Sequence, residues 1–99
     1  MSDWRKIFEH WNFPFIQRGG VTLVARSDAP ACIDLIYANH YLFFGYDAFT
    51  VTDNSIQPHL TWSPSWKDFE APTSADLLLQ IESHPPEVTH YEFVFKSKA

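Results

Sequence analysis

The sequence predicts an α+β protein, in which one mostly antiparallel sheet of four or five strands carries two or three helices packed on it. Three observations predict this class. Segments with the helical spacing of apolar residues alternate with short runs rich in β-branched and aromatic residues. Several of these runs are separated only by turn residues, which is typical of antiparallel neighbours. The length of 99 residues and the 45% apolar content fit one globular domain, residues 1–99, with a core of its own.

The chain is expected to begin with a helix over residues 3–12. Its apolar side chains recur at the i, i+3, i+4, i+7 spacing of one helix face, and they are Trp4, Ile7, Phe8 and Trp11. Ser2 or Asp3 can cap this helix, and Pro14 lies just beyond its end. The following residues look irregular and finish in a Gly19-Gly20 turn.

A strand and a second helix are expected next. Residues 21–26 are short and β-branched, which favours a strand. Residues 31–39 favour a helix, because the preceding "SDAP" is a typical helix entry with proline in the first turn. The apolar residues are nearly continuous there, so a strand through 32–37 remains the alternative. If residues 21–44 form a parallel βαβ unit, its crossover should be right-handed.

The middle of the chain is expected to supply three strands. Residues 40–44 form a buried apolar run, and Gly45 indicates a bend before a second, half-buried strand at 47–52. The Asp-Asn-Ser turn that follows favours a hairpin with residues 56–62. Pro58 confines that last strand to a sheet edge or a bulge, because proline has no N–H to give to a ladder.

The last third is expected to form two helices and a strand. Residues 63–69 offer a short helix start, capped by Ser63 or, in capping-box spacing, by Ser65 with Asp68. Residues 73–84 open with a second capping box, Thr73 to Asp76, and should form a longer helix that Pro85-Pro86 ends. Residues 87–95 alternate as a strand, whose aromatic side chains share one face.

The charge distribution constrains the partners. The net charge is −5, and residues 27–95 hold ten carboxylates but only one base, Lys67. An acidic segment of this size repels nucleic acid and anionic membrane surfaces, and it attracts a basic protein. Solubility alone is the simpler explanation of the same charge.

No motif for a metal, a cofactor or a nucleophile occurs in the sequence. The single cysteine, Cys32, has no disulfide partner in the chain and is expected in the core. HExxH, CxxC, GxSxG and phosphate-loop spacings are absent. The N-terminus lacks the apolar region of a secretory signal and no run is long enough to span a membrane, so a cytoplasmic protein without a cofactor is expected.

A small enzyme or ligand-binding domain is one alternative. His90 and Glu92 would lie on the same face of the last strand and could act as an acid/base pair, and His59 is a further candidate for such a site. The simpler interpretation is a solvated strand face.

The stretch "TWSPSW" favours a different class of function. Trp62 and Trp66 can form a hydrophobic staple around the cap of the 63–69 helix. Alternatively, a core already crowded with aromatic residues leaves one indole exposed as an anchor for a partner, with carboxylates around it. The sequence therefore predicts a non-enzymatic inhibitor or immunity-type protein that neutralises or regulates a basic partner, such as a nuclease toxin. A subunit that pairs with its own copies, as in a homodimer, is the other alternative. The expected contact residues are Trp62, Trp66, Asp53, Asp68, Glu70 and Asp47.

Overall fold

A five-stranded antiparallel sheet with the strand order β1-β2-β5-β3-β4 organises the molecule. The computed structural model describes residues 4–59, 62–66 and 72–96. The strands are β1 (Ile16–Arg18), β2 (Val21–Ala25), β3 (Leu42–Val51), β4 (Ile56–His59) and β5 (His90–Lys96). The helices are α1 (Trp4–His10), α2 (Ala29–Ala38) and α3 (Ser74–Ser83), and a short 3-10 turn, η1, spans Arg26–Asp28. The predicted α+β class is confirmed.

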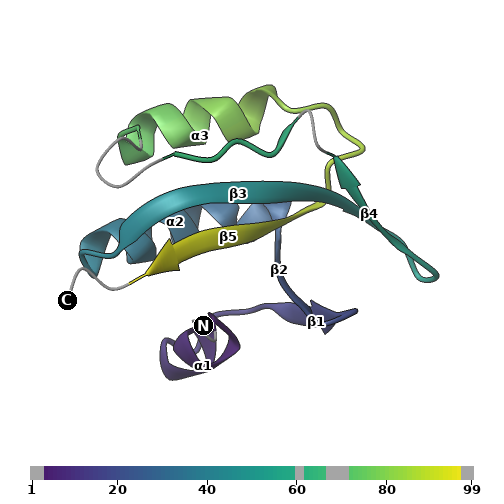
Figure 1. The fold of residues 1–99 in the computed structure, drawn as a ribbon, viewed down its shortest axis with the longest axis horizontal. Helices are drawn as coiled ribbons and strands as arrows, with labels where there is room; N and C mark the ends of the chain where they lie inside the picture. Colours follow the sequence, from purple (N-terminus) through teal and green to yellow (C-terminus); the bar gives the residue numbers. More distant parts are fainter. Residues whose placement is uncertain (1–3, 60–61, 67–71, 97–99) are drawn as a thin grey trace.

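The helices cover one face and two sides of the sheet (Figure 1). Helix α2 lies behind β3 and β5, α3 runs along the β3 side, and α1 lies on the β5 side. The side chains of Tyr91, Phe93 and Phe95 on β5 are at most 2% exposed and belong to the main core, as the alternation predicts. The intervening Glu92 and Val94 are half-buried. The near face of β3 and β5 in Figure 1 carries no helix from the described part of the chain.

The two longer helices form where the sequence indicates. Helix α2 begins with a proline in its first turn and buries Cys32, Ile33 and Ile36, so the helix predicted for residues 31–39 is confirmed and the alternative strand is wrong. Helix α3 is capped by Thr73, whose hydroxyl accepts a hydrogen bond from the Asp76 N–H at 3.2 Å. No helix among the residues described here is long and apolar enough to cross a bilayer.

The strands differ from expectation in three ways. The runs predicted as strands 40–44 and 47–52 form the single strand β3, because Gly45 takes up a register shift instead of a bend. The short strand β1 lies in the segment expected to be irregular, and it pairs with β2 across the Gly19-Gly20 turn. The parallel βαβ unit exists as β2-α2-β3, but β5 lies between its two strands and is antiparallel to both.

The expected helix start at residues 63–69 is wrong for its described part. Residues 63–66 are not helical, and Ser65 forms an isolated antiparallel bridge with Gly45. The edge of β3 beyond β4 offers backbone hydrogen bonds to this segment, and these bonds outweigh the local capping signal. Residues 67–71, which include Asp68, lie outside the described residues.

The two outer hairpins approach each other. The guanidinium of Arg18 in β1 donates to the carbonyl oxygens of Thr52 at 3.1 Å and Asp53 at 3.5 Å, in the turn between β3 and β4. A Cβ added at Gly19 would lie 3.2 Å from the Ile56 side chain in β4. The sheet is therefore curled, with its two edges brought together at one end.

Candidate functional site

Residues 62–66, hereafter the strap, extend the sheet along the edge of β3. The Trp66 N–H donates to the Phe44 carbonyl at 2.6 Å, and the Tyr46 N–H donates to the Pro64 carbonyl at 3.2 Å. The Ser63 hydroxyl accepts from the Ala48 N–H at 3.2 Å. These bonds fill donors and acceptors that β4 is too short to reach, so the strap is fixed to the sheet by its backbone.

Gly45 allows the strap to come this close. A Cβ built at Gly45 would lie 2.3 Å from the Pro64 carbonyl oxygen and 2.9 Å from the Ser65 Cα. Both atoms belong to the backbone, so the strap would have to move to make room. The glycine that the sequence marks as a bend therefore serves as a docking point for the segment that carries the two tryptophans.

Both tryptophans are half-buried, and they pack on different partners. Trp66 lies with its ring centroid 6.3 Å from Phe43 and 6.4 Å from Tyr46. The Trp62 ring lies 5.2 Å from the His84 ring. The predicted hydrophobic staple does not occur, because residues 63–66 form no helical turn. Each indole instead joins the edge of the core while keeping part of its surface in solvent.

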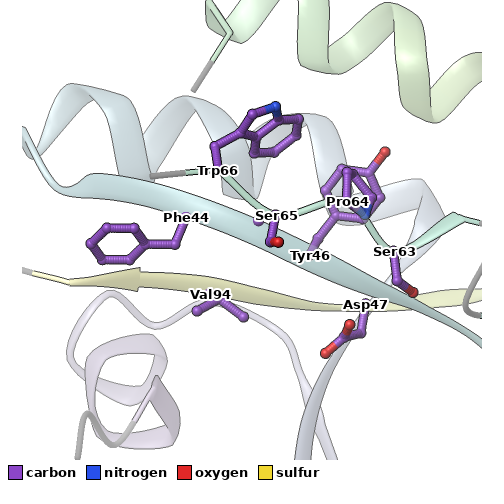
Figure 2. Close-up of a pocket in the computed structure, with 9 residues that line it drawn as sticks. Phe44, Tyr46, Asp47, Ser63, Pro64, Ser65, Trp66 and Val94 are labelled. Atoms are coloured by element: carbon purple, nitrogen blue, oxygen red, sulfur yellow. The ribbon is translucent and has the colours of Figure 1, made fainter. Parts of the chain in front are cut away.

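A hollow lies on each side of Pro64. The larger has a volume of about 310 Å³ and opens beside β3 and β5. Figure 2 shows Asp47 and Val94 on one side of the strap and the Trp66 indole on the other. The smaller, of about 210 Å³, lies between the strap and α3. Tyr46 and Pro64 line both hollows, so the strap forms a ridge between them.

Two carboxylates face each other next to the larger hollow. Asp47 on β3 is the cross-strand partner of Glu92 on β5. Burial raises the pKa of Asp47, and burial together with the Asp47 charge raises the pKa of Glu92. No cation among residues 4–59, 62–66 and 72–96 forms an ion pair with either group. Like charges directly opposite on neighbouring strands are unfavourable, so this pair favours the approach of an external cation.

The other expected contact residues are placed differently. Asp53 is exposed in the turn between β3 and β4, at the far end of β4 from the strap. Asp68 and Glu70 lie outside the described residues. Glu92, considered in the sequence only as a catalytic group, is the carboxylate that lies beside Asp47. The pairing of β3 with β5 brings them together, and the sequence alone does not specify that pairing.

The residues considered for acid/base chemistry have separate partners. His90 Nδ1 lies 2.9 Å from the Thr89 hydroxyl, and His59 Nε2 lies 2.5 Å from the Thr50 hydroxyl. His90 also lines a small hollow of about 120 Å³ together with Asp28. Burial and the Arg18 charge lower the pKa of His90. In the described residues no hydrogen bond joins either histidine to Glu92, and no group of three or more metal-ligating side chains occurs.

A buried polar network was missed in the sequence. The hydroxyls of Tyr46 and Tyr91 lie on either side of His84, and Arg26 holds the loop after α3. Burial raises the pKa of both tyrosines to about 12. Arg26 and His84 are far apart in the sequence, and neither belongs to a motif. The sequence gives one indication of this network, which is that Tyr91, a residue with a polar hydroxyl, occupies an inward position of an apolar strand.

No protein-family model, curated protein or solved structure matches this chain.

Proposed function

We propose that this protein acts by binding a basic partner protein at the strap, without covalent chemistry, in the manner of an inhibitor or immunity-type protein. The observation that carries the proposal is the strap itself, which holds two half-buried indoles and separates two hollows. The larger hollow is lined by Asp47, the cross-strand partner of Glu92. Aromatic groups that are partly desolvated before binding make effective anchors. The carboxylates add attraction for a cation and fix the orientation of the partner.

The larger hollow suits a basic side chain. Phe44 and Val94 supply apolar surface for a methylene stem, and Asp47 supplies the charge at the wall. A lysine or arginine of the partner would replace the water around carboxylates whose pKa values are already raised by burial. Gly45 and the backbone bonds hold the strap in place, which reduces the ordering cost of binding.

The proposal is tested by site-specific photo-crosslinking in extracts of the native host. A photoreactive residue replaces Ser65, which is exposed on the strap, and a matched control replaces Ala31, which is exposed on α2. We expect one basic protein to be captured from position 65 and not from position 31. Capture should decrease with added salt, because exposed charges are screened.

The tryptophans are then tested in the same assay. We expect Trp66→Ala and Trp62→Ala to reduce capture at position 65 by at least tenfold, whereas Leu79→Ala, at a residue 65% exposed on α3, leaves it unchanged. Identical captured sets at the two positions, or capture that is insensitive to both tryptophan substitutions, would contradict the proposal.

A further inference from the structure

His84 connects the strap to the core. It follows the last turn of α3 and is 7% exposed. Its ring lies 5.2 Å from that of Trp62 in the strap and 5.8 Å from those of Tyr46 in β3 and Tyr91 in β5. One imidazole thus contacts the strap and two neighbouring strands of the sheet.

The hydrogen bonds around His84 suit the neutral ring. Its Nδ1 lies 2.8 Å from the Tyr91 hydroxyl, and its Nε2 lies 3.3 Å from the Tyr46 hydroxyl. The Tyr46 hydroxyl also lies 3.2 Å from the Gln80 side-chain oxygen. In the neutral state, the Tyr91 hydroxyl can donate to His84 Nδ1, and His84 Nε2–H can donate to the Tyr46 hydroxyl. The Tyr46 hydroxyl then donates to the Gln80 side-chain oxygen, so each of these protons has an acceptor. A second proton on the ring would make Nδ1 a donor and leave the Tyr91 O–H without its acceptor.

The charges around His84 oppose its protonation. The groups that face it are Tyr46 from β3, Tyr91 from β5, Gln80 and Ser83 from α3, Trp62 and Pro64 from the strap, and Arg26 from η1. Among residues 4–59, 62–66 and 72–96, Arg26 is the only charged group that faces His84, and no carboxylate faces it. Burial and the Arg26 charge lower the pKa of His84.

The Arg26 side chain cannot move away from His84 without losing hydrogen bonds. Its guanidinium donates to the carbonyls of Ile81, His84, Pro85 and Val88, at distances from 2.7 to 3.1 Å. Because these bonds fix the loop after α3, the positive charge stays beside the imidazole. A protonated His84 would relieve the repulsion by moving the imidazole or the groups packed on it.

The strap contacts His84 through Trp62, and it is joined to β3 by two backbone hydrogen bonds and the Ser63 hydroxyl. Tyr46 joins the two features, because its hydroxyl contacts His84 and its backbone N–H donates to Pro64. We propose that His84 is a pH switch for the strap: the neutral ring holds the strap against Tyr46, and protonation releases it. This inference rests on the proposed function, since a released strap loses both hollows and weakens the binding of the basic partner.

The test measures hydrogen exchange at two backbone amides of the intact protein. The Trp66 and Tyr46 N–H groups bond across the strap–β3 contact and report its opening directly. The opening equilibrium constant should rise about tenfold in acid for each unit by which the pKa of His84 lies below its value in the open state. Exchange rates are corrected for the intrinsic pH dependence of amide exchange. As the pH falls from 7.5 to 5, we expect the corrected rates to rise in the wild type and in the control variant His10→Gln, because His10 is exposed on α1.

His84→Gln is the deciding variant. A glutamine amide can accept from Tyr91 and donate to Tyr46 but does not titrate in this range, so its strap amides should exchange at a pH-independent corrected rate. The same acceleration in His84→Gln, or none in the wild type, would overturn the proposal. If His84→Gln does not fold, NMR titration of the wild-type imidazole decides: His84 and the strap amides should share one midpoint below pH 6.5, and separate midpoints would overturn it.

Both readouts are internal to the chain, so they do not depend on a partner. If Trp62→Ala and Trp66→Ala both leave capture unchanged while exchange of the strap amides still depends on His84, the proposed function fails and the switch stands. If the tryptophan substitutions reduce capture as expected but the corrected exchange rates of the strap amides do not change with pH, only the switch proposal fails.

Discussion

The core has two ends along β5, and they are built differently. At the Phe95 end, the rings of Trp4, Phe8, Trp11 and Tyr41 lie with centroids 5.3 to 6.4 Å from Phe95. Trp4 Nε1 also donates a hydrogen bond to the Phe95 carbonyl at 2.9 Å. At the Tyr91 end, the packing of Tyr46, His84 and Trp62 depends on hydroxyls, an imidazole and a guanidinium.

The two ends should therefore differ in how their contributions to the stability of the fold depend on pH. Among the described residues, the rings packed on Phe95 include no imidazole, so the contribution of this packing should be insensitive to pH between 5.5 and 7.5. The Tyr91 end needs specific donors and acceptors, and an unpaired buried polar group costs more than the bond contributes. Trp62 in the strap and the smaller hollow adjoin the Tyr91 end, so one side of the proposed binding surface lies against the end that contains the titratable network.

The largest expected effect is at the Phe95 end. Phe8→Ala removes a side chain that is 1% exposed and that contacts Trp11, Phe13, Phe15 and Phe95. We expect a loss of about 3–5 kcal/mol in the free energy of unfolding, measured by urea denaturation. Phe8→Leu should lose less, because it leaves a smaller cavity. The Phe8→Ala loss should be equal at pH 7.5 and pH 5.5, and a pH-dependent loss would contradict the comparison.

A smaller loss is expected from Arg26→Lys at the Tyr91 end. An ammonium has three donors and lacks the planar fork that reaches four carbonyls, so at least one carbonyl loses its partner. We expect about 1–3 kcal/mol by urea denaturation. The control is Arg18→Lys, whose bonds are exposed and which should lose under about 1 kcal/mol. Equal losses in the two variants would show that the four bonds of the partly buried Arg26 guanidinium have no special role.

The dependence of stability on pH should come in part from the Tyr91 end. The pKa of His84 in the folded protein is lowered, so the unfolded chain binds the proton first as the solution is acidified. Stability is therefore complete above about pH 6.5 and decreases as pH falls toward the folded-state pKa. His90, whose pKa is also lowered, adds in the same direction. The free energies of unfolding of the wild type and of His84→Gln, plotted against pH, should converge at lower pH. A constant difference between them across this pH range would contradict the assignment to His84.

The smallest effect concerns the carboxylate pair. Glu92→Gln removes the repulsion with Asp47 and should stabilise the protein by about 0.2–1 kcal/mol at pH 7.5. Because the pKa of Glu92 is raised in the folded state, the gain should vanish once acid protonates the carboxylates. The control Glu87→Gln, at an exposed residue, should show no such gain. The same Glu92 substitution should weaken capture of a basic partner.

Local patterns were enough to predict most of the fold. The capping box of α3, the helical stripe of α1 and the alternation of β5 each depend on residues close in sequence, and all three elements form as predicted. The strap was assigned wrongly because its structure depends on the unpaired edge of β3 and on the missing Cβ of Gly45. Both are tertiary features that a local capping signal does not register.

The candidate site was less predictable for the same reason. Trp62 and Trp66 were identified by residue type, but their partners His84 and Phe43 are set by the order of the strands. Asp47 and Glu92 are 45 positions apart and meet only through the register of β3 with β5.

The closure of the sheet at its two hairpins affects how copies of the chain meet at high concentration. Pro58 in the edge strand β4 has no N–H to offer a neighbouring strand, and Arg18 ties the β1–β2 hairpin to the β3–β4 turn. Intermolecular strand addition, the usual first step toward aggregation of a β-rich domain, is opposed at this end of the sheet. The protein can thus present aromatic surface to another molecule without also presenting an open strand edge there.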